Sequence, residues 1–145
     1  MADIHPAHYL RRLVRQKRVA IATLLTGAIL LTGQLAAATA DALEGRWSGT
    51  FTIGQDDTRE LIFTLHARDS GYTATLDLPA QASAGIQVDS VTLHGSEITM
   101  VVRAVRAEFY GTLRWSDDRT QIERIDGDWN QAGEYVAVTL RPQAH

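Results

Sequence analysis

The feature that most constrains the fold is an alternation of apolar and polar residues along positions 45–141. At its start, Trp47, Gly49 and Phe51 share one side of the chain, and Ser48 and Thr50 fall between them. Apolar residues at every second position are typical of half-buried β-strands, because successive side chains of a strand point to opposite faces. The pattern predicts eight strands, at residues 45–53, 60–66, 72–78, 86–94, 98–102, 109–115, 122–130 and 135–141.

Short polar turns separate these segments, and their spacing indicates an antiparallel meander. Residues 79–85 are rich in small side chains and form the longest predicted loop, and a change of phase near Asp89 and Ser90 predicts a bend. Closing the meander on itself removes its unpaired edges. The sequence therefore predicts an all-β domain, an eight-stranded antiparallel up-and-down barrel, with a β-sandwich as the alternative.

Residues 1–40 have a different character and predict a hydrophobic targeting helix. Five basic residues before position 19 precede an uncharged run of 22 residues at 19–40, which ends in Ala38-Thr39-Ala40. This order is typical of a secretory signal peptide. The run is also just long enough to span a membrane, so an uncleaved anchor is the alternative. Residues 41–145 are thus expected in the bacterial periplasm or outside the cell, either released or tethered to the inner membrane through residues 19–40.

We expect cleavage after Ala40, which leaves Asp41 as the first residue of the exported protein, because small residues at the exit of the apolar run suit signal peptidase. N-terminal sequencing of the exported protein tests this expectation. Recovery of a chain with intact Met1 from the membrane fraction would show an anchor instead.

Composition excludes several classes of function. The chain has no cysteine, so the domain has neither disulfides nor a lipoprotein anchor. Residues 41–145 hold 16 acidic residues against 9 arginines and no lysine, a formal net charge of −7. Such a domain repels phosphate backbones, so nucleic acid is not an expected partner.

Several segments of the domain carry a resemblance to a known family. They are residues 45–49, 76–81, 85–91, 110–113, 127–133 and 138–140. In order and spacing they resemble the β-rich module that precedes the catalytic domain in some secreted bacterial α/β-hydrolases of the serine-aminopeptidase type. The family's Gln-Gly-Ala run reads Gln81-Ala82-Ser83-Ala84 here, and no Gly-x-Ser-x-Gly nucleophile occurs in the chain. The resemblance implies a fold and an exported setting, without an activity.

A second, shorter motif is similar to one found in lipocalins. Gly45-Arg46-Trp47 at the start of the first strand matches their Gly-x-Trp, in which the tryptophan closes one barrel end under an arginine of the last strand. The resemblance implies a lipocalin-like barrel, with Arg141 as the arginine over Trp47. A core tryptophan without that role is the alternative.

No group of residues predicts catalysis, a metal or a cofactor. The histidines of the domain, His66, His94 and His145, stand alone and read as solvated turn residues. Asp126 and Asp128 would share one face of a strand, but two carboxylates are too few to hold calcium. We therefore expect no catalytic, cofactor-binding or metal-binding residues, and a protein that is not an enzyme.

Arg103, Arg106 and Glu108 predict either a ligand or partner surface or a salt-bridged strand exterior. The sequence favours a non-enzymatic accessory or interaction module with an unknown protein partner. The alternative is a carrier of a small apolar ligand within or at the mouth of the barrel. A carrier needs an apolar pocket of about 300–1,000 Å³. An interaction module needs an exposed apolar patch or an unpaired strand edge.

Overall fold

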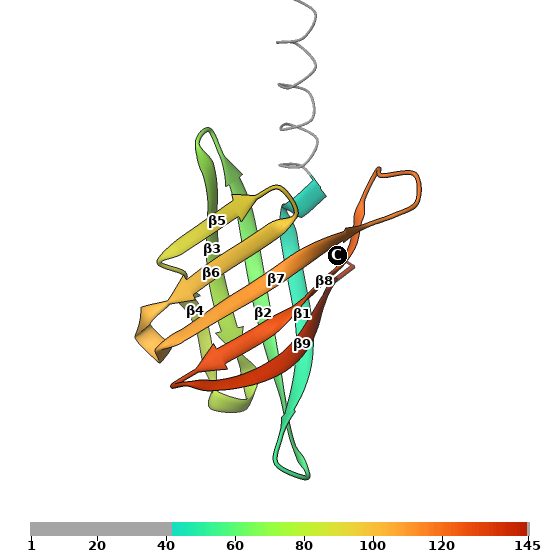
Figure 1. Ribbon diagram of the computed structural model, residues 1–145. Coiled ribbons are helices and arrows are strands. Elements are labelled where there is room, and N and C mark those ends of the chain that lie inside the picture. Colours follow the sequence, from blue (N-terminus) through green and yellow to red (C-terminus); the bar gives the residue numbers. More distant parts are fainter. Residues whose placement is uncertain (1–41, 145) are drawn as a thin grey trace, which may run out of the picture. The chain divides into compact units, whose positions relative to one another are not determined.

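The computed structural model describes residues 42–144, so the predicted targeting segment at 1–40 lies outside the described residues. The described part is all-β, and its nine antiparallel strands form one curled sheet, a half-barrel (Figure 1). The strands are β1 (Gly45–Ile53), β2 (Asp57–Arg68), β3 (Gly71–Leu78), β4 (Ser83–Gln87), β5 (Ser90–His94), β6 (Glu97–Val102), β7 (Ala107–Trp115), β8 (Ile122–Gln131) and β9 (Glu134–Pro142). Within this part of the chain, no helix has the length and apolar character to cross a membrane.

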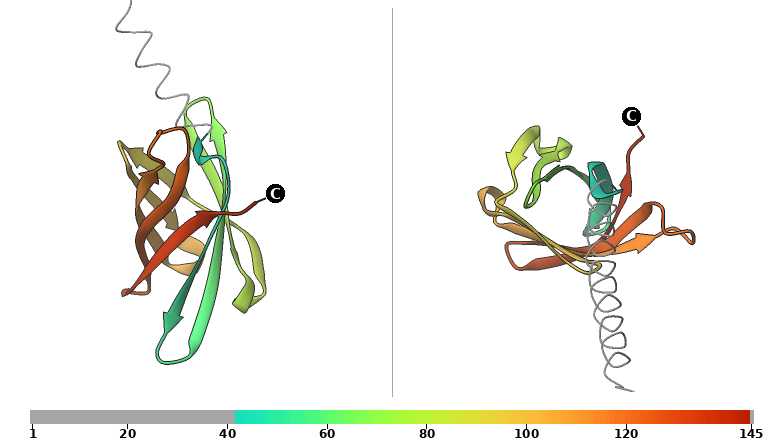
Figure 2. Two further views of the ribbon diagram at one scale, coloured as in Figure 1. Left: turned by 90° about the vertical axis from the view of Figure 1, so that its right-hand side faces the viewer. Right: turned by 90° about the horizontal axis from the view of Figure 1, so that it is seen from above.

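The strand order is β4-β3-β2-β1-β9-β8-β7-β6-β5. The first strand therefore pairs with the last, and the middle of the chain supplies both edges of the sheet. Figure 2 shows the sheet folded over, with β1 to β4 facing β5 to β9. The chain runs directly from one edge strand, β4, to the other, β5. On the way, the Val88 N–H donates to the Ala74 carbonyl of β3, and the Asp89 N–H donates to the Val101 carbonyl of β6.

The expected count of eight strands is wrong by one, because the segment predicted at 86–94 breaks at Val88 and Asp89. The predicted bend lies there, but the backbone changes partner at that point, from β3 to β6. The long loop expected at 79–85 is also wrong. It contains a 3-10 helix, η1 (Pro79–Gln81), followed directly by β4. A second 3-10 helix, η2 (Arg103–Val105), links β6 to β7.

The apolar positions of the alternating pattern form the core between the two halves of the sheet. Apolar residues on these faces include Trp47, Phe63, Leu76, Leu113 and Trp129, and all five are buried. The ring of Phe63 lies 5.8 Å from that of Phe109 and 6.2 Å from that of Trp129, centre to centre. These three aromatic side chains fill the middle of the half-barrel, and their offset and edge-on contacts are the favourable ones.

The two ends of the half-barrel differ. At the upper end of Figure 1, Leu43 and Trp47 are buried, and the Trp47 indole donates to the Leu43 carbonyl at 2.9 Å. At the end called the lower end here, the β1–β2 hairpin, η1, η2 and the β8–β9 turn come together. The upper end is thus filled by the buried side chains of Leu43 and Trp47, beside a hollow of about 230 Å³, and the lower end holds a larger one.

Candidate functional site

A hollow of about 380 Å³ lies at the lower end of the half-barrel. Its apolar lining comes from inward positions at the ends of strands and from η2, and consists of Phe51, Ile53, Val105, Trp129 and Val136. Its polar lining comes from the surrounding turns and strand ends, and consists of Arg59, Gln81, Arg106, Gln131 and Glu134, with Ala132 between them. The arrangement gives an apolar floor under a polar rim, which is typical of sites for small molecules.

Trp129 at the floor has an unusual electrostatic feature. The residue is 1 % exposed, and its indole N–H is buried without an acceptor among the described residues. A buried donor left without a partner costs about 1–3 kcal/mol. The Trp129 side chain forms part of the floor of the hollow, while its nitrogen is closed to solvent.

Two turns form one lip of the hollow and hold each other in place. Arg106 and Ala132 both adopt the left-handed backbone conformation, with φ values of 53° and 54°. The Ala132 N–H donates to the Arg106 carbonyl at 3.1 Å, and the Gln131 side chain donates to the Val105 carbonyl at 3.2 Å. The backbone around Arg106 is therefore fixed on both sides, although its conformation is costly for a residue with a Cβ atom.

The charged groups of the rim differ in whether they form an ion pair. The Arg59 guanidinium contacts the Asp57 carboxylate at 2.7 Å, and this hydrogen bond lowers the pKa of Asp57. Arg106 has no ion-pair partner within residues 42–144. Glu134, at the start of β9, is the acidic member of the lining. Of the two rim arginines, Arg106 is therefore the one whose guanidinium is not engaged by a carboxylate of the described residues.

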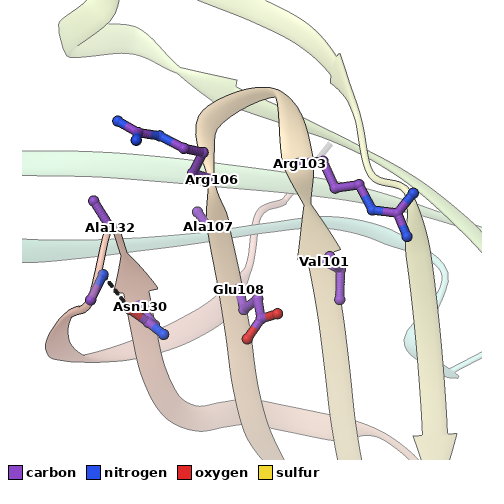
Figure 3. A pocket seen from close by; sticks show the side chains of 8 residues that line it. Val101, Arg103, Arg106, Ala107, Glu108, Asn130 and Ala132 are labelled. Atoms are coloured by element: carbon purple, nitrogen blue, oxygen red, sulfur yellow. Dashed lines mark hydrogen bonds between the residues drawn. The ribbon is translucent and has the colours of Figure 1, made fainter.

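A second, smaller hollow of about 260 Å³ lies on the outer side of the same lip (Figure 3). Arg103, Arg106, Glu108 and Asn130 are among its lining residues. The exterior here is only partly salt-bridged. Arg103 reaches Asp89 at 4.0 Å, whereas Glu108 accepts a hydrogen bond from the Tyr110 hydroxyl. Arg106 and Ala132 line both hollows, so the lip is shared.

The single histidines lie away from both hollows. His66 is exposed within β2 and is not the turn residue expected from the sequence, since the strand continues to Arg68. His94 is exposed and closes β5 beside a turn, as expected. His145 lies outside the described residues. The structure thus brings neither described histidine to a residue that lines the candidate site.

Asp126 and Asp128 do share the outer face of β8, and Asp126 is engaged in ion pairs. Its carboxylate contacts Arg114 at 2.9 Å and Arg124 at 3.0 Å, and these hydrogen bonds hold its pKa below the usual value. Within the described part of the chain, no three His, Asp or Glu side chains gather as metal ligands do.

The proposed arginine over Trp47 is not found. Trp47 is buried as expected, but Arg141 pairs with Ser48 and is exposed next to the buried Leu140. Arg141 lines an outer groove with Thr50 and Asp126. The strand alternation sends its side chain to the outer face, so the contact implied by the lipocalin motif does not form, and Trp47 is a core tryptophan without that role.

Sequence reasoning identified Arg106 as a candidate but missed the hollow beside it. Ile53 and Val136 belong to no motif, and they meet Gln131 only because several strands end at one place. The sequence offered one signal for them, their position. Each of these three residues lies in or within two residues of a predicted turn. Searches against protein-family models, curated proteins and solved structures find no significant match to this chain.

Proposed function

We propose that this domain binds a small molecule with an apolar body in the hollow at the lower end of the half-barrel. The observation that carries the proposal is the apolar floor of Phe51, Trp129 and Val136 beneath a polar rim. At about 380 Å³ the hollow falls at the small end of the range of ligand sites. The role is carriage or sensing, without chemistry on the ligand.

The same proposal includes the closed, lipocalin-like barrel and the exported setting. Closure is supported by the pairing of β1 with β9 and by the direct passage of the chain from edge strand β4 to edge strand β5 through Val88 and Asp89. The exported setting is supported by the basic cluster and the uncharged run at 19–40. The proposal is thus a carrier protein outside the cytoplasm that is related to the hydrolase-associated modules.

Filling the hollow is expected to abolish binding. Val136 is half-buried and lines the floor, so Val136→Phe adds a ring to the space that an apolar chain would occupy. Titration of the purified chain with octanol, followed by calorimetry and tryptophan fluorescence, should show at least about a tenfold loss of affinity, since displaced apolar contacts of a few methylenes are worth over about 1.4 kcal/mol.

Ala137→Phe is the matched control, because the next residue of β9 is exposed on the opposite face. This variant should bind octanol as the unaltered protein does. Equal affinities of all three proteins, or no binding by any, would contradict the proposal.

An interaction module is the second candidate, favoured by one observation. Tyr110 and Tyr135, on the outer face of β7 and β9, are 42 % and 66 % exposed. Tyrosine is enriched at binding hot spots, because it offers a large apolar surface and a hydroxyl at low entropic cost. This surface, on the outside of the sheet, would serve a protein partner.

A further inference from the structure

We infer that the ligand of the lower hollow is an anionic amphiphile, whose carboxylate contacts the Arg106 guanidinium at the lip while its apolar chain lies on the floor. This inference rests on the proposed function and adds the chemical class of the ligand. It starts from Arg106, which lines both the apolar hollow and the outer one.

Arg106 is the available cation at this end of the domain. Arg59 is engaged by Asp57 at 2.7 Å, and Arg103 lies near Asp89 at 4.0 Å, but Arg106 has no such partner within the described residues. Figure 3 shows the Arg106 side chain extending over Ala132 and away from Arg103. A guanidinium binds a carboxylate through two parallel N–H donors, so a free arginine at the lip suits that headgroup.

The turn itself does not require a cation. η1 and η2 have the same design, in which a three-residue 3-10 helix is followed by a left-handed residue that donates its N–H to the first carbonyl of the turn. That residue is Ala82 after η1 and Arg106 after η2, with φ values of 49° and 53°. Since alanine suffices in the same geometry, the charge and length of Arg106 are not explained by folding.

Glu134 on the rim opposes an anionic ligand, since its carboxylate would favour a cationic one. A cationic ligand paired with Glu134 is therefore the alternative to an anionic ligand paired with Arg106, and binding experiments distinguish the two.

The experiment compares octanoate, octanol and octylamine at neutral pH, titrated into the purified chain by calorimetry. These ligands share one apolar chain and differ in headgroup charge. We expect octanoate to bind about threefold to fivefold more tightly than octanol, and octylamine most weakly, because an ion pair with an exposed arginine is worth up to about 1 kcal/mol. Glu134→Gln should leave the affinity for octanoate unchanged or higher.

Arg106→Asn tests the contact, because asparagine tolerates the left-handed conformation and should keep the fold. It should remove the advantage of octanoate over octanol and leave octanol binding intact. Arg103→Asn, the same change at the 82 % exposed side chain across η2, should preserve that advantage. Melting curves of both variants establish that they are folded.

The outcomes distinguish the two proposals. If octanol binds and Val136→Phe abolishes it, but octanoate has no advantage or Arg106→Asn does not reduce it, the inference about Arg106 is wrong and the binding function stands. Tighter binding of octylamine than of octanol would show that Glu134 determines the charge preference of the rim, and it would also overturn the inference. If none of the three ligands binds, the proposed function fails, and the inference fails with it.

Discussion

Trp129→Ala is expected to bring the domain close to unfolding. The side chain is 1 % exposed and packs against Phe63 in the middle of the half-barrel. Truncating a buried tryptophan typically costs about 3–5 kcal/mol, against a total stability of about 5–15 kcal/mol for a domain. Without disulfides, the core alone must make up the difference. Thermal and urea unfolding should therefore show a fall in melting temperature of more than about 10 °C.

Trp115→Ala and Trp129→Phe are the controls for this experiment. Trp115 lies half-buried at the end of β7, so the same truncation there should cost much less. Trp129→Phe keeps most of the apolar surface and removes an N–H that has no partner within residues 42–144, so its loss of stability should be less than half that of the alanine variant. A melting temperature of Trp129→Ala within a degree or two of the unaltered protein would show that the assignment of this face to the core is wrong.

Gly127→Ala is expected to destabilise the domain by an amount near the upper end of the range of about 1–3 kcal/mol for overpacked cores. A Cβ atom at Gly127 would lie 2.2 Å from the Tyr110 carbonyl oxygen and 2.7 Å from Phe109 Cζ. The backbone oxygen belongs to the neighbouring strand β7, so it cannot move aside as a flexible side chain would. Relief of the contact requires the β7–β8 pair to separate or the Phe109 ring to leave its place.

The cause is purely steric, because Gly127 is not among the glycines with positive φ. Gly111, its partner across the ladder, has the same crowding from the Phe109 ring, so the two glycines make room for that side chain. Asp128→Ala, at the exposed neighbouring position, is the matched control and should change the free energy of unfolding by less than about 0.5 kcal/mol. Equal unfolding curves for Gly127→Ala and the control would refute the close approach of the strands.

The strands were predictable where one face is buried. In β1, Trp47 and Phe51 alternate with exposed or half-buried polar residues, and the predicted bounds of 45–53 match the structure. In β4, by contrast, Ser83–Gln87 carries no buried residue and pairs only with β3 at the edge of the sheet. A strand without a buried stripe has no period of two, which is why residues 83–85 were predicted to be part of a loop and only Ile86 and Gln87 were assigned to a strand.

The candidate site was predictable only in part. Arg106 attracted attention as a charged residue among alanines, but its left-handed backbone and its lack of an ion pair depend on the turn after η2 and on the hydrogen bond from Ala132. Phe51 and Trp129 lie in predicted strands, and nothing in their spacing placed them at the same end of the half-barrel. Their meeting is a consequence of strand register.

By itself, the sequence determined the all-β class, the inward face of most strands, the acidic and cysteine-free character of the domain, and the absence of any nucleophile motif. These properties follow from local alternation and composition, which act over a few neighbouring residues. The tertiary structure decided that β1 pairs with β9, that the chain changes sheet partners at Val88 and Asp89, and that a hollow lies between η2 and the end of β1. These features join residues up to about 90 positions apart, as in the pairing of Ser48 with Arg141, and depend on register and packing that no local pattern encodes.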